Sequence, residues 1–204
     1  MVKVKICGLR RPEDIEAANV AKPDFVGFIF VPETKRYVKP DLAASFRREL
    51  ATDIQTVGVF VNAPIEEIVA ICQPGTIDLV QLHGEEDQAY IAHLKGQVDQ
   101  HIIKSVAVGD ELVVDPNQAD YLLFDSLSPS RGGSGKVFDW QMVSAYQEKP
   151  FFLAGGLGVE NIEEDLKVVR PYAVDASSSL ETDGVKDPVK MQEFVAKIRE
   201  VTHD

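Results

Sequence analysis

Apolar and polar residues alternate along this chain with two different periods. In residues 2–9, apolar side chains alternate with Lys3, Lys5 and Cys7, which gives a strand with one apolar and one polar face. Short apolar runs rich in β-branched and aromatic residues recur after it, and most are followed by a longer segment of helical period. The pattern therefore predicts strands and helices that follow each other in turn.

Eight such strand–helix units fit into the 204 residues, at intervals of roughly 25 residues. The expected strands are residues 2–9, 25–30, 55–61, 77–82, 102–108, 121–124, 151–154 and 172–176. The expected helices are residues 12–20, 41–50, 65–72, 85–94, 139–146, 160–169 and 188–201, with room for only a short helix in 110–117.

Strands that alternate with helices indicate a parallel sheet with right-handed crossovers. Eight units without a break predict an α/β protein with one domain, a (β/α)8 TIM barrel over residues 1–204. A doubly wound open sheet is the alternative, but its central strands would be apolar on both faces. Here several strands carry polar groups on one face, which in a barrel is the interior: Lys5, Cys7, Gln81, His83, Lys104, Asp125, Asp175 and Ser177.

Composition narrows the range of functions. The net charge is −12 and basic residues form no run, so we expect no nucleic-acid partner. Apolar runs stay well short of the ~20 residues that cross a bilayer, and a strand stands where a signal peptide would lie, so we expect a cytoplasmic protein without membrane contact. Cys7 and Cys72 lie far apart without metal-ligand spacing, which fits a reducing compartment. The oligomeric state stays open.

Small polar residues end the last two expected strands. Gly155 and Gly156 follow strand seven, and Ser177 and Ser178 follow strand eight. In a barrel these adjacent loops often bind a phosphate through backbone N–H groups and hydroxyls. Ordinary turn residues are the alternative explanation for either pair alone. Both pairs at the matching loops favour a phosphate site.

Three further side chains stand at the carboxyl ends of strands, where α/β enzymes keep their active sites. Cys7 ends the first strand, and Lys5 two residues behind it would favour the thiolate, although a lone cysteine is more often a small core residue. Asp125 follows an apolar strand as a candidate general acid, or else as a loop or capping residue. His83 could contact a substrate or close the barrel.

Two long loops contain further candidates for the functional site. Arg36 in residues 31–40 could hold a carboxylate with two hydrogen bonds, or be a solvated surface residue. The Gly- and Ser-rich residues 126–137 are typical of a lid or of a plain linker.

Lys5 and Lys104, if buried, need a partner such as Asp175. A lysine of lowered pKa would also allow Schiff-base chemistry, which keeps an aldolase as a minor alternative.

Taken in order, these stretches resemble the phosphoribosylanthranilate isomerase family over essentially the whole chain. The residues that carry the resemblance are 5–8, 27–30, 36–38, 57–61, 80–84, 123–125, 132–135, 138–140, 153–157 and 175–178. The resemblance implies a cofactor-free barrel enzyme of tryptophan biosynthesis, with no metal, acting on a small-molecule phosphosugar. Its reaction would be the Amadori rearrangement of N-(5-phosphoribosyl)anthranilate to 1-(2-carboxyphenylamino)-1-deoxyribulose 5-phosphate.

By position, the resemblance implies Cys7 as general base and Asp125 as general acid. It implies Arg36 near the anthranilate carboxylate, His83 as a substrate contact and Asp175 at a ribose hydroxyl. The phosphate would be bound by Gly155, Gly156, Ser177 and Ser178. Two positions depart from the family pattern, Ser179 in place of glycine and Ala176 in place of valine.

Rival functions remain at this point. Another phosphosugar isomerase or epimerase on the same barrel is one, including an enzyme that accepts both a histidine-pathway and a tryptophan-pathway substrate. A barrel that binds a phosphate ligand without catalysis is another, and the presence of both Cys7 and Asp125 argues against it.

Overall fold

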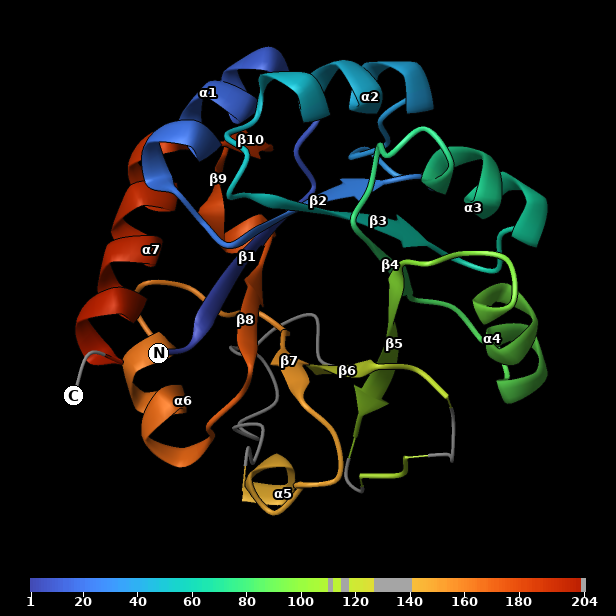
Figure 1. Ribbon diagram of the computed structural model, residues 1–204. Coiled ribbons are helices and arrows are strands. Elements are labelled where there is room, and N and C mark those ends of the chain that lie inside the picture. The colour runs from blue at the N-terminus through green and yellow to red at the C-terminus, as the bar shows by residue number, and fades with distance from the viewer. Residues whose placement is uncertain (110–111, 115–117, 127–140, 203–204) are drawn as a thin grey trace.

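The computed structural model describes residues 1–109, 112–114, 118–126 and 141–202. Eight parallel strands form a closed barrel in chain order, with β8 paired to β1, and the helices lie around the outside (Figure 1). The strands are β1 (Lys3–Cys7), β2 (Phe25–Ile29), β3 (Gln55–Phe60), β4 (Leu79–Leu82), β5 (His101–Val108), β6 (Tyr121–Ser126), β7 (Phe151–Leu153) and β8 (Ala173–Ala176). The predicted (β/α)8 barrel is therefore confirmed.

The helices agree with the helical segments of the sequence, apart from their ends. They are α1 (Pro12–Ala21), α2 (Pro40–Glu49), α3 (Ile65–Cys72), α4 (Gln88–Lys95), α5 (Gln141–Ser144), α6 (Ile162–Val168) and α7 (Pro188–Val201). Residues 112–114 are not helical, and the rest of the short helix expected over 110–117 lies at least partly outside the described residues. Among the described residues, no helix is long and apolar enough to cross a membrane.

Local chemistry explains where the last helix begins. The Asp187 carboxylate accepts hydrogen bonds from the N–H groups of Val189 and Lys190, which satisfies two donors that an isolated helix start leaves unpaired. Pro188 occupies the first helical turn, where its missing N–H costs nothing. The helix then packs beside α1 on the outside of the barrel (Figure 1).

The alternation in β1 sorts its side chains as predicted. Val4 and Ile6 are fully buried in the layer between strands and helices, whereas Lys5 points into the barrel. A separate apolar cluster made by β2 to β8 fills the barrel interior below the polar groups: Phe25, Val57, Leu79, Ile103, Leu123, Phe152, Ala154 and Ala173. The polar groups therefore meet only near the carboxyl ends of the strands.

The prediction that Lys104 points into the barrel interior is wrong. Its neighbour Ile103 belongs to the interior cluster, so Lys104 faces the opposite side of β5. There its Nζ donates to the Gly84 carbonyl and lies 2.9 Å from Oε2 of Glu86. Because Ile102 and Ile103 are both apolar, the sequence pattern does not decide which of them points inward. Lys104 is therefore not among the interior polar groups.

The sequence pattern does not predict the short hairpin that follows β8. Strands β9 (Glu181–Thr182) and β10 (Val185–Lys186) pair antiparallel across the turn residues Asp183 and Gly184, which have φ of 53° and 77°. An Asp-Gly pair is a strong signal for this two-residue turn, in which both central residues have positive φ. The flanking segments are only two residues long, so they have no visible alternation.

Candidate active site

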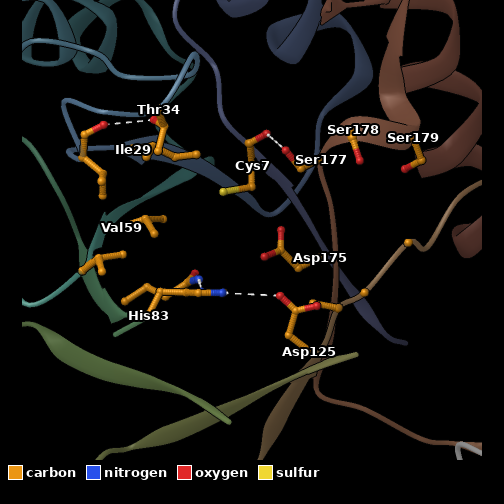
Figure 2. A pocket seen from close by; sticks show the side chains of 16 residues that line it. Cys7, Ile29, Thr34, Val59, His83, Asp125, Asp175, Ser177, Ser178 and Ser179 are labelled. Carbon is orange, nitrogen blue, oxygen red and sulfur yellow. Dashed lines mark hydrogen bonds and ion pairs between the residues drawn. The ribbon is translucent and has the colours of Figure 1, made fainter. Parts of the chain in front are cut away.

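A cavity of about 330 Å³ opens at the carboxyl ends of the barrel strands. Of the residues predicted for the site, it brings together Cys7, His83, Asp125, Asp175, Gly155, Gly156, Ser177 and Ser178. Arg36 does not line the cavity. In Figure 2, Cys7 and the Asp125–His83 pair lie on opposite sides of this cavity, and Asp175 lies between them.

Cys7 is buried at the end of β1, with 7% of the residue exposed. Gly27 on the neighbouring strand makes room for it, because a Cβ atom at Gly27 would lie 2.6 Å from the Cys7 Sγ. Gly8 then turns the chain with φ of 86°, a backbone conformation that L residues rarely adopt. Two glycines therefore allow the thiol to stand at the cavity wall.

The electrostatics of Cys7 differ from the expectation that Lys5 makes it a thiolate. Burial raises the pKa of the thiol, and Lys5, helped by Lys186, offsets only part of this rise. Lys5 is fully buried, and its Nζ lies 2.7 Å from Oδ2 of Asp175. Burial alone would lower the pKa of Lys5, but Asp175 and Cys7 raise it, so the lysine stays charged. Desolvation outweighs the nearby ammonium, and the free site holds mainly a thiol.

Only one of the two carboxylate oxygens of Asp175 has a hydrogen-bond partner among the described residues. Its Oδ2 accepts from Lys5, whereas Oδ1 is buried without a hydrogen-bond partner among the described residues. A buried acceptor of this kind usually has a water or ligand partner. Since Asp175 lines the cavity, Oδ1 is placed to accept a hydrogen bond from a bound hydroxyl.

Asp125 and His83 form a pair on the other wall. Asp125 lies in β6 near its carboxyl end, and its Oδ2 lies 3.4 Å from Nε2 of His83, just beyond the end of β4 (Figure 2). Gln81, two residues earlier, places its amide nitrogen 2.9 Å from Nδ1 of the same imidazole. The sequence pattern had placed Gln81 on the interior face but had given it no role.

The two loops predicted to bind phosphate meet at the cavity. Gly155 and Gly156 have φ of 94° and 75°, values that favour glycine. The Ser177 hydroxyl donates to the Cys7 carbonyl over 3.0 Å, and the Ser179 hydroxyl donates to the Leu157 carbonyl. Ser179, one of the departures from the family pattern, thus links the two loops.

Arg36 is held away from the cavity by the hairpin that the sequence did not predict. Its Nε and Nη2 donate to Oε1 and Oε2 of Glu181 over 2.6 and 2.9 Å. The buried Lys186 also donates to Glu181 Oε1, over 2.8 Å. Two cations therefore share one carboxylate, and the cluster keeps a net positive charge beside the site.

An apolar wall completes the cavity. Ile29 and Val31 from β2 and the loop after it line one part, and Val59 and Val61 from β3 and its end line another. Such a surface suits an aromatic ring. Sequence reasoning missed these residues because apolar side chains at strand ends look like ordinary core positions.

Replacing Glu181 by glutamine should lower stability near neutral pH more than in acid. Burial alone would raise the pKa of Glu181, but hydrogen bonds from Arg36 and Lys186 lower it to about 2. A carboxyl with a depressed pKa stabilises the fold above its ordinary value near 4.5, and this is lost as pH falls toward 2. Urea unfolding at pH 7, 4 and 3 measures the change, with Glu193→Gln on the exposed face of α7 as control. A constant difference between wild type and Glu181→Gln at all three pH values would contradict the assignment.

Two further expectations stay untested. Within the described part of the chain, no group of three or more His, Cys, Asp or Glu side chains could hold a metal ion. That the chain needs neither a metal nor a cofactor stays a prediction. The predicted lid over 126–137 lies almost wholly outside the described residues, as do the family-like stretches 132–135 and 138–140.

Comparisons with known proteins agree with this geometry. The family model of N-(5'phosphoribosyl)anthranilate (PRA) isomerase matches residues 4–197. The N-(5'-phosphoribosyl)anthranilate isomerase of Endomicrobium trichonymphae is 48% identical over 200 residues, which cover 98% of this chain and 99% of that protein.

Two solved structures are also similar to the chain. The phosphoribosyl anthranilate isomerase of Thermotoga maritima is 34% identical with a TM-score of 0.83, and the match covers 98% of this chain and 100% of that one. A phosphoribosyl anthranilate isomerase in complex with reduced 1-(o-carboxyphenylamino)-1-deoxyribulose 5-phosphate is 31% identical with a TM-score of 0.82, at the same coverage. On the family match and this identity along its whole length, the chain belongs to the N-(5'-phosphoribosyl)anthranilate isomerase family.

Proposed function

We propose that this chain converts N-(5-phosphoribosyl)anthranilate to 1-(2-carboxyphenylamino)-1-deoxyribulose 5-phosphate in tryptophan biosynthesis, with Asp125 as general acid and Cys7 as general base. The observation that supports the two roles is their placement on opposite walls of one cavity, in a member of this isomerase family. Residues 1–204 would act as one catalytic domain, in the cytoplasm.

The first step uses Asp125. Its carboxyl group gives a proton to the furanose ring oxygen as the bond from that oxygen to C1 breaks, and the nitrogen lone pair forms the C1=N iminium. A group must be placed on the ring-oxygen side to do this, and Asp125 lies across the cavity from Cys7. The carboxylate left behind lies 3.4 Å from the His83 Nε2.

The second step uses Cys7. As a thiolate it takes the C2 proton. The electron pair of the C2–H bond forms the C1=C2 double bond, and the π electron pair of the C1=N bond returns to nitrogen as its lone pair. The enolamine then gains a proton at C1 and loses the hydroxyl proton at C2, which gives the ketone. C1 is reduced and C2 is oxidised within one molecule, so the reaction needs no outside electron acceptor. The raised pKa of the thiol means that the thiolate is a minor species near neutral pH.

Other residues would hold the substrate between these two groups. The unpaired Asp175 Oδ1 accepts from a ribose hydroxyl, and the apolar wall of Ile29 and Val59 packs on the anthranilate ring. The loops at Gly155 and Ser178 bind the phosphate. Arg36 binds the carboxylate of the anthranilate through N–H groups that Glu181 does not use, or after exchanging partners.

The proposal is tested by turnover. Purified protein supplied with N-(5-phosphoribosyl)anthranilate should form the deoxyribulose phosphate, and the gene should restore growth to a tryptophan auxotroph that lacks only this isomerase. Offering the corresponding histidine-pathway substrate separates a strict isomerase from one with two substrates. A folded protein that binds the product but forms none of it would favour the non-catalytic alternative.

Replacing Ser178 by aspartate should nearly abolish substrate binding. A carboxylate among the donors of the phosphate loops would repel the substrate's phosphate. KM should rise strongly. Inorganic phosphate should inhibit the wild type competitively and should lose this effect on the variant. Ser178→Ala is the matched control, since it removes the hydroxyl without adding charge. Normal kinetics in a folded Ser178→Asp enzyme would place the phosphate elsewhere.

Replacing Arg36 by alanine should lower kcat/KM by about 30- to 150-fold, which corresponds to the 2–3 kcal/mol of a charge-assisted contact. The loss should fall mainly on KM, and it should be much smaller for a phosphosugar analogue without the carboxylate. Arg170→Ala, an exposed arginine at the other end of the barrel, is the control. Equal losses for both substrates would mean that Arg36 acts only through its pairing with Glu181.

A further inference from the structure

We propose that Gln81 is a positioning residue of this reaction, which holds His83 as the neutral Nε2–H tautomer so that the imidazole cannot take the proton of Asp125. The inference rests on the proposed function, in which Asp125 gives that proton to the substrate. It assigns a role to a side chain that the mechanism above leaves unused.

The geometry begins with the Gln81 amide, which is 1% exposed on the interior face of β4. Its Nε2 lies 2.9 Å from Nδ1 of His83. An amide nitrogen carries only donors, so Nδ1 must be the acceptor and the ring proton must stand on Nε2. That Nε2 lies 3.4 Å from Oδ2 of Asp125. The imidazole therefore turns an N–H toward the acid.

The tautomer matters because a free imidazole is ordinarily a stronger base than a carboxylate. A bare Nε2 beside Asp125 would accept the proton that the furanose ring oxygen needs. Full protonation of His83 would place an Nδ1–H against the amide N–H of Gln81, donor against donor. With the amide donating to Nδ1, the Nε2–H stays directed at Asp125.

The other side of the amide can hold the same orientation when a substrate is bound. Gln81 Oε1 is buried, has no hydrogen-bond partner among the described residues, and belongs to a side chain that lines the cavity. A substrate hydroxyl or N–H that donates to Oε1 would satisfy it. Such a contact would also keep the amide nitrogen directed at His83 while the substrate is bound.

The charges around the pair do not decide the tautomer by themselves. Asp175 on β8 interacts electrostatically with both Asp125 and His83, but Lys5 on β1 balances it at 2.7 Å. Cys7 on β1 is mainly a thiol. On the β4 and β5 side, Lys104 and Glu86 neutralise each other at 2.9 Å. The uncharged Gln81 amide, the group in contact with Nδ1, is left to select it.

Two substitutions of similar shape separate this role from packing. Gln81→Met keeps the length of the side chain and removes the donor, whereas Gln81→Glu keeps the shape and presents an acceptor to Nδ1. We expect kcat to fall by about tenfold to 10²-fold in Gln81→Met, a part of the factor that a general acid supplies, and further in Gln81→Glu. A packing role would lower stability in both variants, most in the glutamate because its charge is buried, but would leave the tautomer of His83 as in the wild type. Gln55→Met, at the exposed amino end of β3, is the control.

A spectroscopic measurement reads the tautomer directly. ¹⁵N-labelled imidazole nitrogens give different chemical shifts in the Nε2–H tautomer, the Nδ1–H tautomer and the imidazolium ion. The signals of His83 are identified among the four histidines by their loss in His83→Asn. Wild type should show the Nε2–H tautomer at pH 7, Gln81→Met a mixture, and Gln81→Glu mainly the imidazolium or the Nδ1–H form.

The outcomes distinguish this inference from the proposed function. An Nδ1–H tautomer or an imidazolium in a wild-type enzyme that turns over would overturn the inference alone. Unchanged ¹⁵N shifts and kcat in folded Gln81→Met and Gln81→Glu would do the same. A wild-type protein that makes no product, whatever its His83 tautomer, would overturn the proposed function and with it the role of Gln81.

Discussion

Exchanging Cys7 for serine is expected to lower kcat by a factor on the order of 10²–10⁴, the usual contribution of a general base. Serine keeps the shape of the side chain, but its hydroxyl is far less acidic than a thiol and offers no anionic base near neutral pH. If Cys7 only filled space beside Gly27, the same exchange would cost stability and leave the rate nearly unchanged. Steady-state kinetics on protein of verified fold measures the difference.

The fate of the C2 proton tests the role more closely. The Cys7→Ser variant should still open the sugar ring and interconvert anomers, because Asp125 is intact, but it should not exchange the C2 proton with deuterium from solvent. Wild-type turnover together with wild-type deuterium exchange in this variant would end the assignment of the thiol as base. Cys72→Ser is the matched control, since Cys72 lies in the α3 core and lines none of the active-site cavity.

The pH dependence follows from the direction of the pKa shift. Burial raises the pKa of Cys7 above its ordinary value, so the thiolate fraction at neutral pH is small and grows as pH rises. The rate at which iodoacetamide alkylates Cys7 in the free enzyme should therefore climb with pH through the region around 8.5, where an ordinary cysteine titrates, instead of levelling off below it. Iodoacetamide should also alkylate Cys7 before Cys72, whose pKa burial raises to about 12, and a product analogue should protect Cys7.

Asp125→Asn should reduce kcat by a comparable factor, on the order of 10²–10⁴, for a different reason. An amide has no proton acidic enough for the furanose ring oxygen, so the reaction should stop before the ring opens. Anomer exchange and C2 deuterium exchange should both be lost, which separates this variant from Cys7→Ser. Both exchanges are followed by NMR on the bound substrate.

Asp120→Asn is the control for Asp125→Asn, because Asp120 directly precedes the amino end of the same strand, β6. Its carboxylate lies 2.7 Å from Lys95 Nζ and accepts from the Ile102 N–H, away from the cavity, so it should affect stability more than rate. If Asp125→Asn retained ring opening, the acid would have to be sought elsewhere, and the His83 contact would then be structural only.

The sequence by itself determined the fold class and most of the site positions. Periods of two and 3.6 residues are local properties, so they placed helices such as 65–72 and 188–201 at the ends that the structure has. Parallel strands in a barrel share one carboxyl end, which is why residues as distant as Cys7, Asp125 and Ser178 could be expected at one cavity. The predicted ends of the other helices and strands differ from the observed ends by a few residues, because local sequence patterns define the ends of elements poorly.

Only the tertiary structure decided the partners of these residues. The sequence pattern gave Arg36 no partner, and it pairs with Glu181, 145 positions away, through a hairpin too short to show alternation. The same holds for the contact of Gln81 with His83, which depends on side-chain direction inside the barrel. A hydrophobic period predicts the face on which a residue lies. It carries no information on which residues from the rest of the chain contact that face.

The protonation of Cys7 shows the same division. A lysine two residues away predicts a lower pKa for the thiol, because that attraction can be read from spacing alone. The desolvation that opposes it depends on how completely other strands and loops enclose the thiol, and the lysine itself is engaged by Asp175 from β8. Charge can be counted along a sequence, whereas burial exists only once the barrel has closed.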